Sequence, residues 1–121
     1  MKTSSCKGKG RGFQNKIRDM YREVGKQVQL VDGDIEGRTM GVAGVDIIFS
    51  PAAKSVINHE IECKKHRKVG VPTEFAKHYA KYKDTPALKL LFHENDRSEP
   101  LVTMKATDFM SLLEKVINQV Q

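Results

Sequence analysis

An eight-residue run, residues 57–64, is the feature that most limits what this chain can fold into. Neighbouring side chains point to opposite faces of a β-strand, so this run separates into two distinct faces. One face is mainly apolar and carries His59, Ile61 and Cys63. The other is polar and carries Asn58, Glu60, Glu62 and Lys64. Unpaired buried charge is costly. We therefore expect a strand with the core on one side and partners or solvent on the other.

The rest of the chain alternates between helical and strand patterns. Apolar residues at helical spacing predict helices that begin near Gly12, at Pro72 and near the cap residue Thr107. Short apolar or alternating runs predict strands at 27–31, 45–49, 57–64, 87–92 and 101–104, with a short helical turn at "SPAAKS". The order α-β-β-β-α-β, followed by a further strand and helix, predicts one mixed α/β domain over residues 12–121. Residues 1–11 are basic and Gly-rich, and we expect a flexible arm there.

Composition limits the class of protein. The chain has 121 residues, of which 39% are hydrophobic and 30% charged, as is typical of a globular domain. No apolar run reaches the roughly 20 residues that a membrane-spanning helix needs, and the N-terminus lacks the apolar segment of a signal peptide. The two cysteines, Cys6 and Cys63, form no disulfide framework. We therefore expect a cytoplasmic protein in a reducing compartment, with no membrane partner.

The net charge of +6, from 21 Lys and Arg against 15 Asp and Glu, favours an anionic partner such as nucleic acid. Basic residues gather in two stretches, one in the N-terminal arm and one directly after the polar strand. We expect six of them to contact DNA phosphates: Lys7, Lys9, Arg11, Lys65, Arg67 and Lys68. An ordinary solvated surface is the alternative for each stretch.

A lone acid, Asp46, lies in the apolar run that precedes the polar strand. Two carboxylates on neighbouring strands, here Asp46 and Glu62, can share a hard divalent cation. Lys64 points the same way as Glu62 and can face the attacking water or the scissile phosphate of a phosphodiester. The alternative for Glu62 and Lys64 is a surface ion pair worth about 0–1 kcal/mol.

The pattern Asp46…Glu62-Cys63-Lys64 resembles the signature of the PD-(D/E)XK nuclease superfamily. The closest resemblance is to small nuclease-like proteins of phages and prophages, including Holliday junction resolvase-like endonucleases. Four ordered segments carry it over residues 7–92: "KGRGFQ" at 9–14, "MGVAGVD" at 40–46, "SPAA" at 50–53 and "ECK" at 62–64. The resemblance implies a restriction-endonuclease-like core, a mixed sheet flanked by helices, to which this chain adds a C-terminal strand and helix.

The resemblance also implies a function and its residues. It implies an Mg²⁺- or Mn²⁺-dependent DNA endonuclease in a bacterial or phage-infected cell, with the metal on Asp46 and Glu62 and a catalytic role for Lys64. Branched DNA is the implied substrate, and a homodimer is implied because a four-way junction has two symmetric strands to cut. Resolvase-like relatives often place a glutamate on the first helix, where this chain has Gln14. The Gln14 amide has no negative charge, but it can hydrogen-bond a metal-bound water.

Two other functions remain open from the sequence. The first is a DNA-binding module that keeps the fold without catalysis, an alternative that Gln14 favours. The second is a nuclease that acts on linear or nicked duplex DNA.

Overall fold

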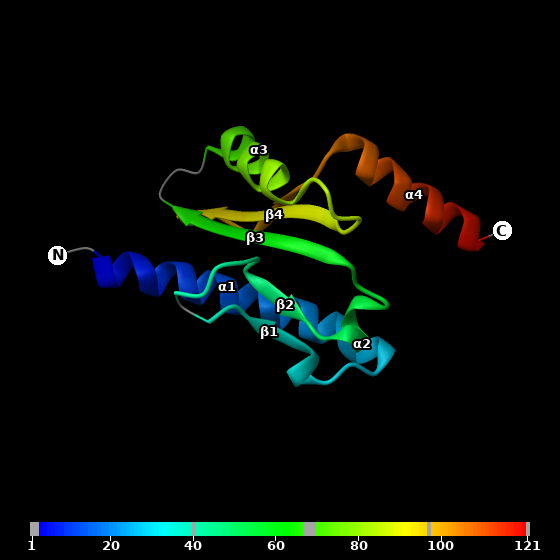
Figure 1. The fold of residues 1–121 in the computed structure, drawn as a ribbon, viewed down its shortest axis with the longest axis horizontal. Helices are drawn as coiled ribbons and strands as arrows, with labels where there is room; N and C mark the ends of the chain where they lie inside the picture. The colour runs from blue at the N-terminus through cyan, green and yellow to red at the C-terminus, as the bar shows by residue number, and fades with distance from the viewer. Residues whose placement is uncertain (1–2, 40, 67–69, 97, 121) are drawn as a thin grey trace.

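The computed structural model describes residues 3–39, 41–66, 70–96 and 98–120, and for residues 3–9, 66 and 120 it describes the backbone alone (Figure 1). Helices and strands alternate along these residues. The helices are α1 (Thr3–Gly25), α2 (Pro51–Lys54), α3 (Val71–Tyr82) and α4 (Ala106–Val120). The strands are β1 (Ile35–Gly37), β2 (Ile47–Phe49), β3 (His59–His66), β4 (Leu88–Asn95) and β5 (Leu101–Thr103). The chain is therefore of mixed α/β class, as the sequence predicts.

The strands form two small sheets that meet at Asp46. Strands β1 and β2 pair antiparallel, while β4 pairs parallel with β3 and antiparallel with β5. Just before β2, the Asp46 N–H donates to the carbonyl of Ile61 in β3 at 2.9 Å, and the Asp46 carbonyl accepts the N–H of Arg38 at 2.8 Å. The strands consequently lie side by side in the order β1-β2-β3-β4-β5.

Helices lie on both sides of β3. In Figure 1, α1 runs beneath β3 and α3 lies above β3 and β4. The core lies on the α1 side, where Phe13 and Ile17 of α1 pack with Ile35, Ile47 and Ile61 of the strands. On the other side, α3 begins with Pro72 in its first turn, as the sequence predicts. His78 of α3 contacts the carbonyl of Glu60 at 2.8 Å through Nε2.

The two faces of β3 separate as their alternation predicts. On the core face, Ile61 is fully buried, and the Nδ1 atom of His59 lies 2.8 Å from the Tyr21 hydroxyl. On the polar face, Glu60 accepts a hydrogen bond from Thr85 Oγ1 at 2.6 Å and lies 3.6 Å from Lys89 Nζ. Glu60 is thus held by its own partners, away from Glu62 and Lys64.

Two expectations for the N-terminal third are wrong. Helix α1 begins at Thr3 rather than Gly12, so most of the predicted arm is helical. The predicted strand at 27–31 is instead a 3₁₀ turn, Lys26–Val28, and Gln29 follows in the left-handed conformation, with φ of 66°. The Leu30 N–H donates to the carbonyl of Gly25 at 3.0 Å and so ends α1. The strand that pairs with β2 is β1, and it begins after a second 3₁₀ turn, Asp32–Asp34.

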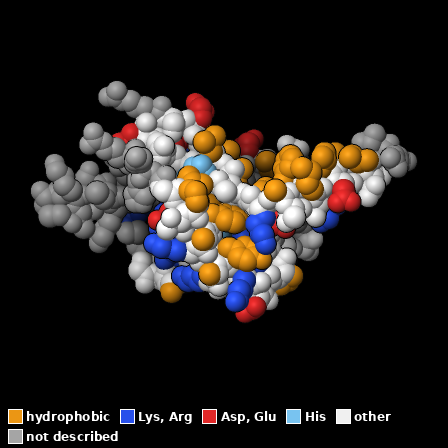
Figure 2. Space-filling model, turned by 90° about the horizontal axis from the view of Figure 1, so that it is seen from above, with side chains coloured by type: hydrophobic (Ala, Val, Ile, Leu, Met, Phe, Trp, Pro, Cys, Tyr) orange, Lys and Arg blue, Asp and Glu red, His pale blue; other side chains and the backbone are white. Residues whose placement is uncertain are grey.

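Helix α4 extends away from the sheets (Figure 1). Its first turn begins at Ala106, before the predicted cap Thr107. The apolar stripe that predicts this helix is largely exposed, and hydrophobic side chains gather along this end of the molecule (Figure 2). The exposed members are Phe109, Met110, Leu113, Val116 and Ile117. Among the described residues, no helix combines the length and the apolar character that crossing a bilayer requires.

Candidate functional site

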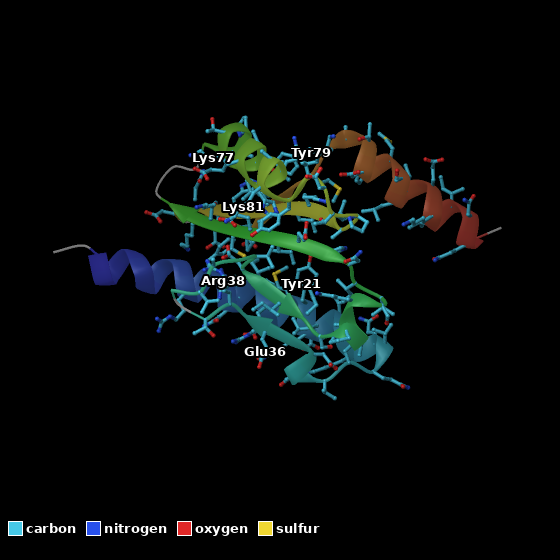
Figure 3. All side chains as sticks on the ribbon, in the orientation of Figure 1. Tyr21, Glu36, Arg38, Lys77, Tyr79 and Lys81 are labelled. Carbon is cyan, nitrogen blue, oxygen red and sulfur yellow. The ribbon has the colours of Figure 1, made fainter. Side chains whose placement is uncertain are left out.

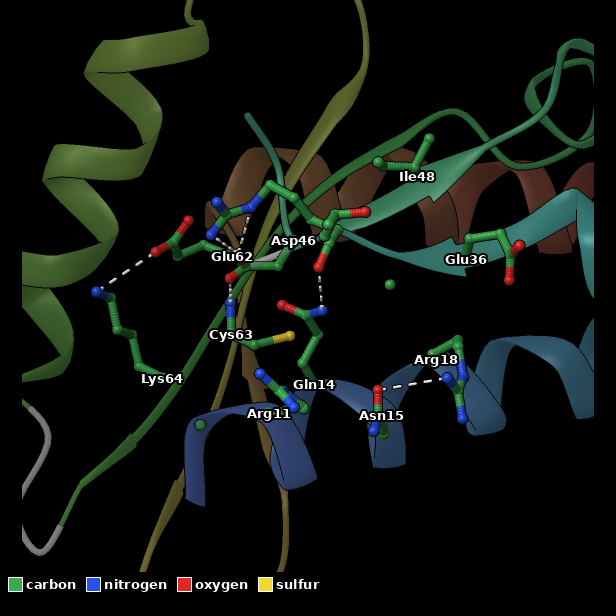
Figure 4. A pocket seen from close by; sticks show the side chains of 14 residues that line it. Arg11, Gln14, Asn15, Arg18, Glu36, Asp46, Ile48, Glu62, Cys63 and Lys64 are labelled. Atoms are coloured by element: carbon green, nitrogen blue, oxygen red, sulfur yellow. Dashed lines mark hydrogen bonds and ion pairs between the residues drawn. The ribbon is translucent and has the colours of Figure 1, made fainter. Parts of the chain in front are cut away.

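A pocket of about 860 Å³ opens where β2 and β3 meet, with α1 forming its opposite wall (Figure 4). The strand side contributes Asp46, Glu62 and Lys64. The helix side contributes Gln14 and a group of polar and basic residues, namely Arg11, Asn15 and Arg18. The pocket therefore brings together all four residues predicted to be catalytic, although they are separated by up to 50 positions in the sequence.

Asp46 is buried at the base of this pocket, with only 5% of its surface exposed. Its Oδ2 atom accepts the backbone N–H of Cys63 at 2.7 Å. Its Oδ1 atom accepts hydrogen bonds from Arg38, from Nη2 at 2.8 Å and from Nε at 3.3 Å. The buried carboxylate is thus paired and hydrogen-bonded, which offsets the cost of removing it from water.

Glu62 and Lys64 lie on the same wall, as the alternation of β3 predicts. Lys64 Nζ lies 3.4 Å from Glu62 Oε2 and 3.8 Å from Glu74 Oε1 in α3. Burial, and then the negative charge of Asp46, raises the pKa of Glu62, while Lys64 offsets part of that shift. The two carboxylates therefore influence each other electrostatically, an arrangement that an added cation would relieve.

Gln14 reaches the same pocket from α1. Its side-chain N–H donates to the carbonyl of Arg38 at 3.1 Å, at the end of β1. This contact requires Gly37, because a Cβ atom at that position would lie 2.7 Å from the Gln14 Nε2 atom. Gln14 thus holds the segment that carries Arg38, a role that the sequence did not indicate.

The six predicted DNA contacts have different positions. Arg11 lines the pocket. Lys65 points elsewhere and pairs with Glu94, which is 2% exposed and also accepts a hydrogen bond from Lys16 at 3.0 Å. The Lys7 and Lys9 side chains, and all of Arg67 and Lys68, lie outside the described residues. Of the six, Arg11 alone is placed at the site by the described part of the chain.

Arg38 and Glu74 are two site residues that sequence reasoning missed. Arg38 stands in the irregular segment "EGRTMGVAG", where no periodicity assigns a direction to its side chain. Figure 3 shows it between β3 and the β1–β2 pair. Glu74 lies in the first turn of α3 and comes near Lys64 only through packing of that helix on the sheet. The weak signal for Arg38 is that it is the basic residue nearest in sequence to the Met40–Asp46 segment.

The donor set can be compared with the needs of a divalent cation. No group of three or more His, Cys, Asp and Glu side chains suited to a metal ion occurs among the described residues. Mg²⁺ commonly takes only one or two carboxylates and keeps water for its other positions. Asp46 and Glu62 supply such a pair of hard oxygen donors beside the pocket. These two carboxylates would therefore suit Mg²⁺ if Arg38 released Asp46 Oδ1.

The surroundings of the Cys63 thiol disfavour its ionised form. Burial raises the pKa of this thiol far above its usual range, and the charges of Asp46 and Glu62 add to that shift. The neutral thiol packs against the hydrophobic core.

Comparison of the chain with protein-family models, with curated proteins and with solved structures gives no match.

Proposed function

We propose that this protein is a metal-dependent DNA endonuclease that hydrolyses phosphodiester bonds. The observation that carries the proposal is the meeting of Asp46, Glu62 and Lys64 on one wall of a single open pocket. Asp46 lies just before β2, whereas Glu62 and Lys64 lie in β3, so the fold brings groups up to 18 positions apart in the sequence to one polar cavity. The resemblance to the PD-(D/E)XK superfamily assigns the same three residues.

The element order supports the same proposal. A helix, three strands, a helix and a fourth strand follow one another, with the short α2 between the second and third strands. The third and fourth strands are parallel and are joined through α3. The same element order is what the resemblance implies for a restriction-endonuclease-like core with β5 and α4 added at the C-terminal end, and it supports the proposal.

Each residue has a distinct part in the proposed chemistry. Asp46 and Glu62 would hold Mg²⁺ or Mn²⁺, which supplies Lewis-acid activation of water and phosphate. Lys64 would orient the attacking water or stabilise the charge that develops on the phosphate. Glu74 Oε1, 3.8 Å from Lys64 Nζ, would help to direct the ammonium group along the wall.

The positive charge of the opposite wall suits a phosphate backbone. Arg11 and Arg18 of α1 line the pocket across from the carboxylates, and the chain as a whole carries a net charge of +6. Figure 3 places two further cations, Lys77 and Lys81, on α3. Such contacts position DNA without reading its sequence, so binding should weaken steeply as salt is added.

The decisive experiment compares Lys64→Ala with the wild type and with Lys54→Ala, which removes an exposed lysine on α2. Purified proteins are incubated with Mg²⁺ and a panel of linear, nicked, forked and four-way DNA. We expect the wild type and Lys54→Ala to cleave at least one substrate. Lys64→Ala should cleave about 10²–10³-fold more slowly while still binding DNA. Absence of metal-dependent cleavage by the wild type on every substrate would overturn the proposal.

The substrate panel also tests the preference for branched DNA, which rests on the family resemblance alone. Faster cleavage of the four-way junction than of linear or nicked duplex would support a resolvase-like enzyme, and we would then expect a homodimer. The reverse order would support a nuclease for duplex DNA.

A second candidate function is a DNA-binding module without catalysis. Two observations favour it: Asp46 is already occupied by Arg38, and Gln14 stands where related enzymes often have a glutamate. Salt-dependent DNA binding by the wild type, with no cleavage in Mg²⁺ or Mn²⁺, would select this candidate.

A further inference from the structure

The Arg38 guanidinium is fully engaged at the proposed metal site. Its Nε and Nη2 atoms donate to Asp46 Oδ1 at 3.3 and 2.8 Å, and its Nη1 atom donates to the carbonyl of Val42. The other oxygen of the carboxylate accepts the N–H of Cys63. Both oxygens of a proposed metal ligand are therefore occupied by N–H donors from the protein itself.

Charge explains why the guanidinium lies there. Asp46 is 5% exposed and faces the negative charge of Glu62 on the same wall. A buried carboxylate without a counter-charge destabilises a fold strongly, and Lys64 is already committed to Glu62 and Glu74. Arg38 consequently supplies the positive charge that Asp46 needs when no other cation is bound.

A divalent cation would bring the same benefit to the same carboxylate. It cannot take Oδ1 while Nε and Nη2 donate to that atom. The remaining lone pair on Oδ2 would set a doubly charged ion close to the guanidinium, and like charges at such separations repel. Guanidinium and cation therefore exclude one another at Asp46.

We propose that Arg38 is a positioning residue that acts as the built-in competitor of the metal, so that a cation binds Asp46 only by displacing the Arg38 side chain. This inference rests on the proposed function, because it takes Asp46 as a metal ligand. In this arrangement Arg38 stabilises the metal-free fold and at the same time weakens metal binding.

The surroundings of Arg38 leave room for its side chain to move away from Asp46 while the protein stays folded. The side chain is 28% exposed and itself lines the pocket of about 860 Å³, so rotation of its own bonds can carry the guanidinium into open space. Beyond the end of β1, the segment contains Gly41 with φ of +81°, a conformation that favours glycine. Gln14 holds only the backbone carbonyl of Arg38 and does not tether its side chain.

The test measures Mn²⁺ binding without DNA, from the loss of the free-ion signal in electron paramagnetic resonance. Arg38→Met keeps an unbranched, flexible side chain and removes the guanidinium group with its charge. If the wild type leaves Asp46 free in about one-tenth of molecules, Arg38→Met should bind Mn²⁺ about tenfold more tightly. The matched control is Arg22→Met. Arg22 donates to the Ile35 carbonyl at 2.8 Å and to Glu36 at 2.6 Å but does not line the pocket, so this variant should bind as the wild type does.

Thermal unfolding supplies a second readout. Without metal, Arg38→Met should melt at a lower temperature than the wild type, because Asp46 loses its counter-charge. Saturating Mg²⁺ should raise the melting temperature of Arg38→Met more than that of the wild type. If Arg38→Met is unfolded in metal-free buffer, recovery of its circular dichroism on addition of Mn²⁺ supports the inference, and failure to recover overturns it.

The outcomes separate this inference from the nuclease proposal. Equal or weaker Mn²⁺ binding by Arg38→Met overturns the role of Arg38, whereas the proposed function depends on cleavage of the DNA panel and on Lys64→Ala. Unchanged Mn²⁺ binding by Asp46→Asn shows that the ion lies elsewhere and also overturns the inference. Tighter binding by Arg38→Met that disappears in the double variant with Asp46→Asn supports it.

Discussion

The backbone N–H of Cys63 donates to Asp46 Oδ2 at 2.7 Å, so a side chain that precedes β2 is fastened to the middle of β3. Cys63 stands between Glu62 and Lys64 in the sequence, so this bond holds one oxygen of the Asp46 carboxylate beside both of them. The convergence of the three proposed catalytic groups therefore depends on a backbone donor whose own side chain packs on the core.

Replacing Glu62 should show how much the fold is destabilised by an ionised Glu62 that is partly buried beside Asp46. The pKa of Glu62 is raised, first by burial and then by Asp46. A carboxyl group with a higher pKa in the folded than in the unfolded state destabilises the fold when ionised. This cost is present at neutral pH, falls as the pH drops through the folded pKa, and is absent below the unfolded pKa of about 4.3.

Glu62→Gln should therefore be more stable than the wild type near neutral pH in metal-free buffer, by up to about 1 kcal/mol because the site is partly exposed. Urea unfolding at neutral pH and near pH 3.5 measures the difference, which should disappear at the acidic pH. Saturating Mg²⁺ should stabilise the wild type more than the variant. Glu23→Gln, which changes an exposed carboxylate on α1, should match the wild type throughout. A less stable Glu62→Gln in metal-free buffer would contradict the prediction.

Gly37→Ala should act through Gln14. The added Cβ would lie 2.7 Å from Gln14 Nε2, so the flexible amide must leave the Arg38 carbonyl. Loss of this bond should cancel the gain of about 0.4–1 kcal/mol that Gly→Ala brings through the unfolded chain. In the Gln14→Ala background nothing is displaced, and Gly37→Ala should then stabilise the protein.

A double-mutant cycle followed by urea unfolding measures this coupling between positions 14 and 37. Gly33→Ala is the control, since a Cβ atom there meets nothing within 4 Å. It should have the same effect whether residue 14 is Gln or Ala. Additive effects of Gly37→Ala and Gln14→Ala would show that the two residues do not compete for space.

Glu94→Gln should weaken the fold in a pH-dependent way. Burial acts to raise the pKa of Glu94, but the hydrogen bonds from Lys65 and Lys16 outweigh it and leave this pKa lowered. A lowered pKa means that the ionised group stabilises the fold above the unfolded pKa of about 4.3 and that this contribution is lost as the pH falls through the folded pKa.

The expected loss for Glu94→Gln is about 1–2 kcal/mol near neutral pH, since both lysines retain contact with water. Urea unfolding should show that the difference in free energy of unfolding between Glu94→Gln and the wild type becomes smaller as the pH is lowered toward 3. Glu114→Gln, an exposed carboxylate on α4, serves as the control and should leave stability unchanged. If the difference in free energy of unfolding does not change with pH, the ion pairs of Glu94 are not its cause.

Two isoleucines should differ sharply in what they contribute. Ile61 is fully buried between β3 and α1, whereas Ile117 on α4 is 46% exposed. Ile61→Ala should cost about 2–5 kcal/mol, and Ile117→Ala should change stability by no more than about 0.5 kcal/mol. Chemical denaturation of the two variants measures both values. A large loss at Ile117 would show that the apolar face of α4 is covered in solution.

The sequence predicts the elements that carry a long or regular pattern. The alternation in β3 runs over eight residues and fixes which side chains face the core, so Ile61, Glu62 and Lys64 are placed correctly. Only one register puts the apolar residues inside, because a shift by one residue would bury the charges. The polar pocket follows from that register and from Asp46 on the neighbouring chain segment.

Shorter or irregular segments carry too little pattern to predict their structure from the sequence. The run at 27–31 has the composition of a strand, yet Gln29 adopts a left-handed conformation and the chain turns there. The pairing of Arg38 with Asp46 has only one weak sequence signal, its closeness along the chain, since no periodic pattern selects one cation among 21 for a given carboxylate. The exposed face of α4 shows the same limit, because helical spacing identifies an apolar face but not what packs on it.

The junction between the two sheets is narrow, and it passes through Asp46. A sheet hydrogen-bonded along its full width would hold neighbouring side chains at one fixed spacing. Here the position of Asp46 beside β3 depends on the bond from its N–H to the Ile61 carbonyl and on the bond from the Cys63 N–H to its Oδ2 atom. A substitution that weakens this junction should therefore displace Asp46 from Glu62 while leaving the pairing within each sheet intact.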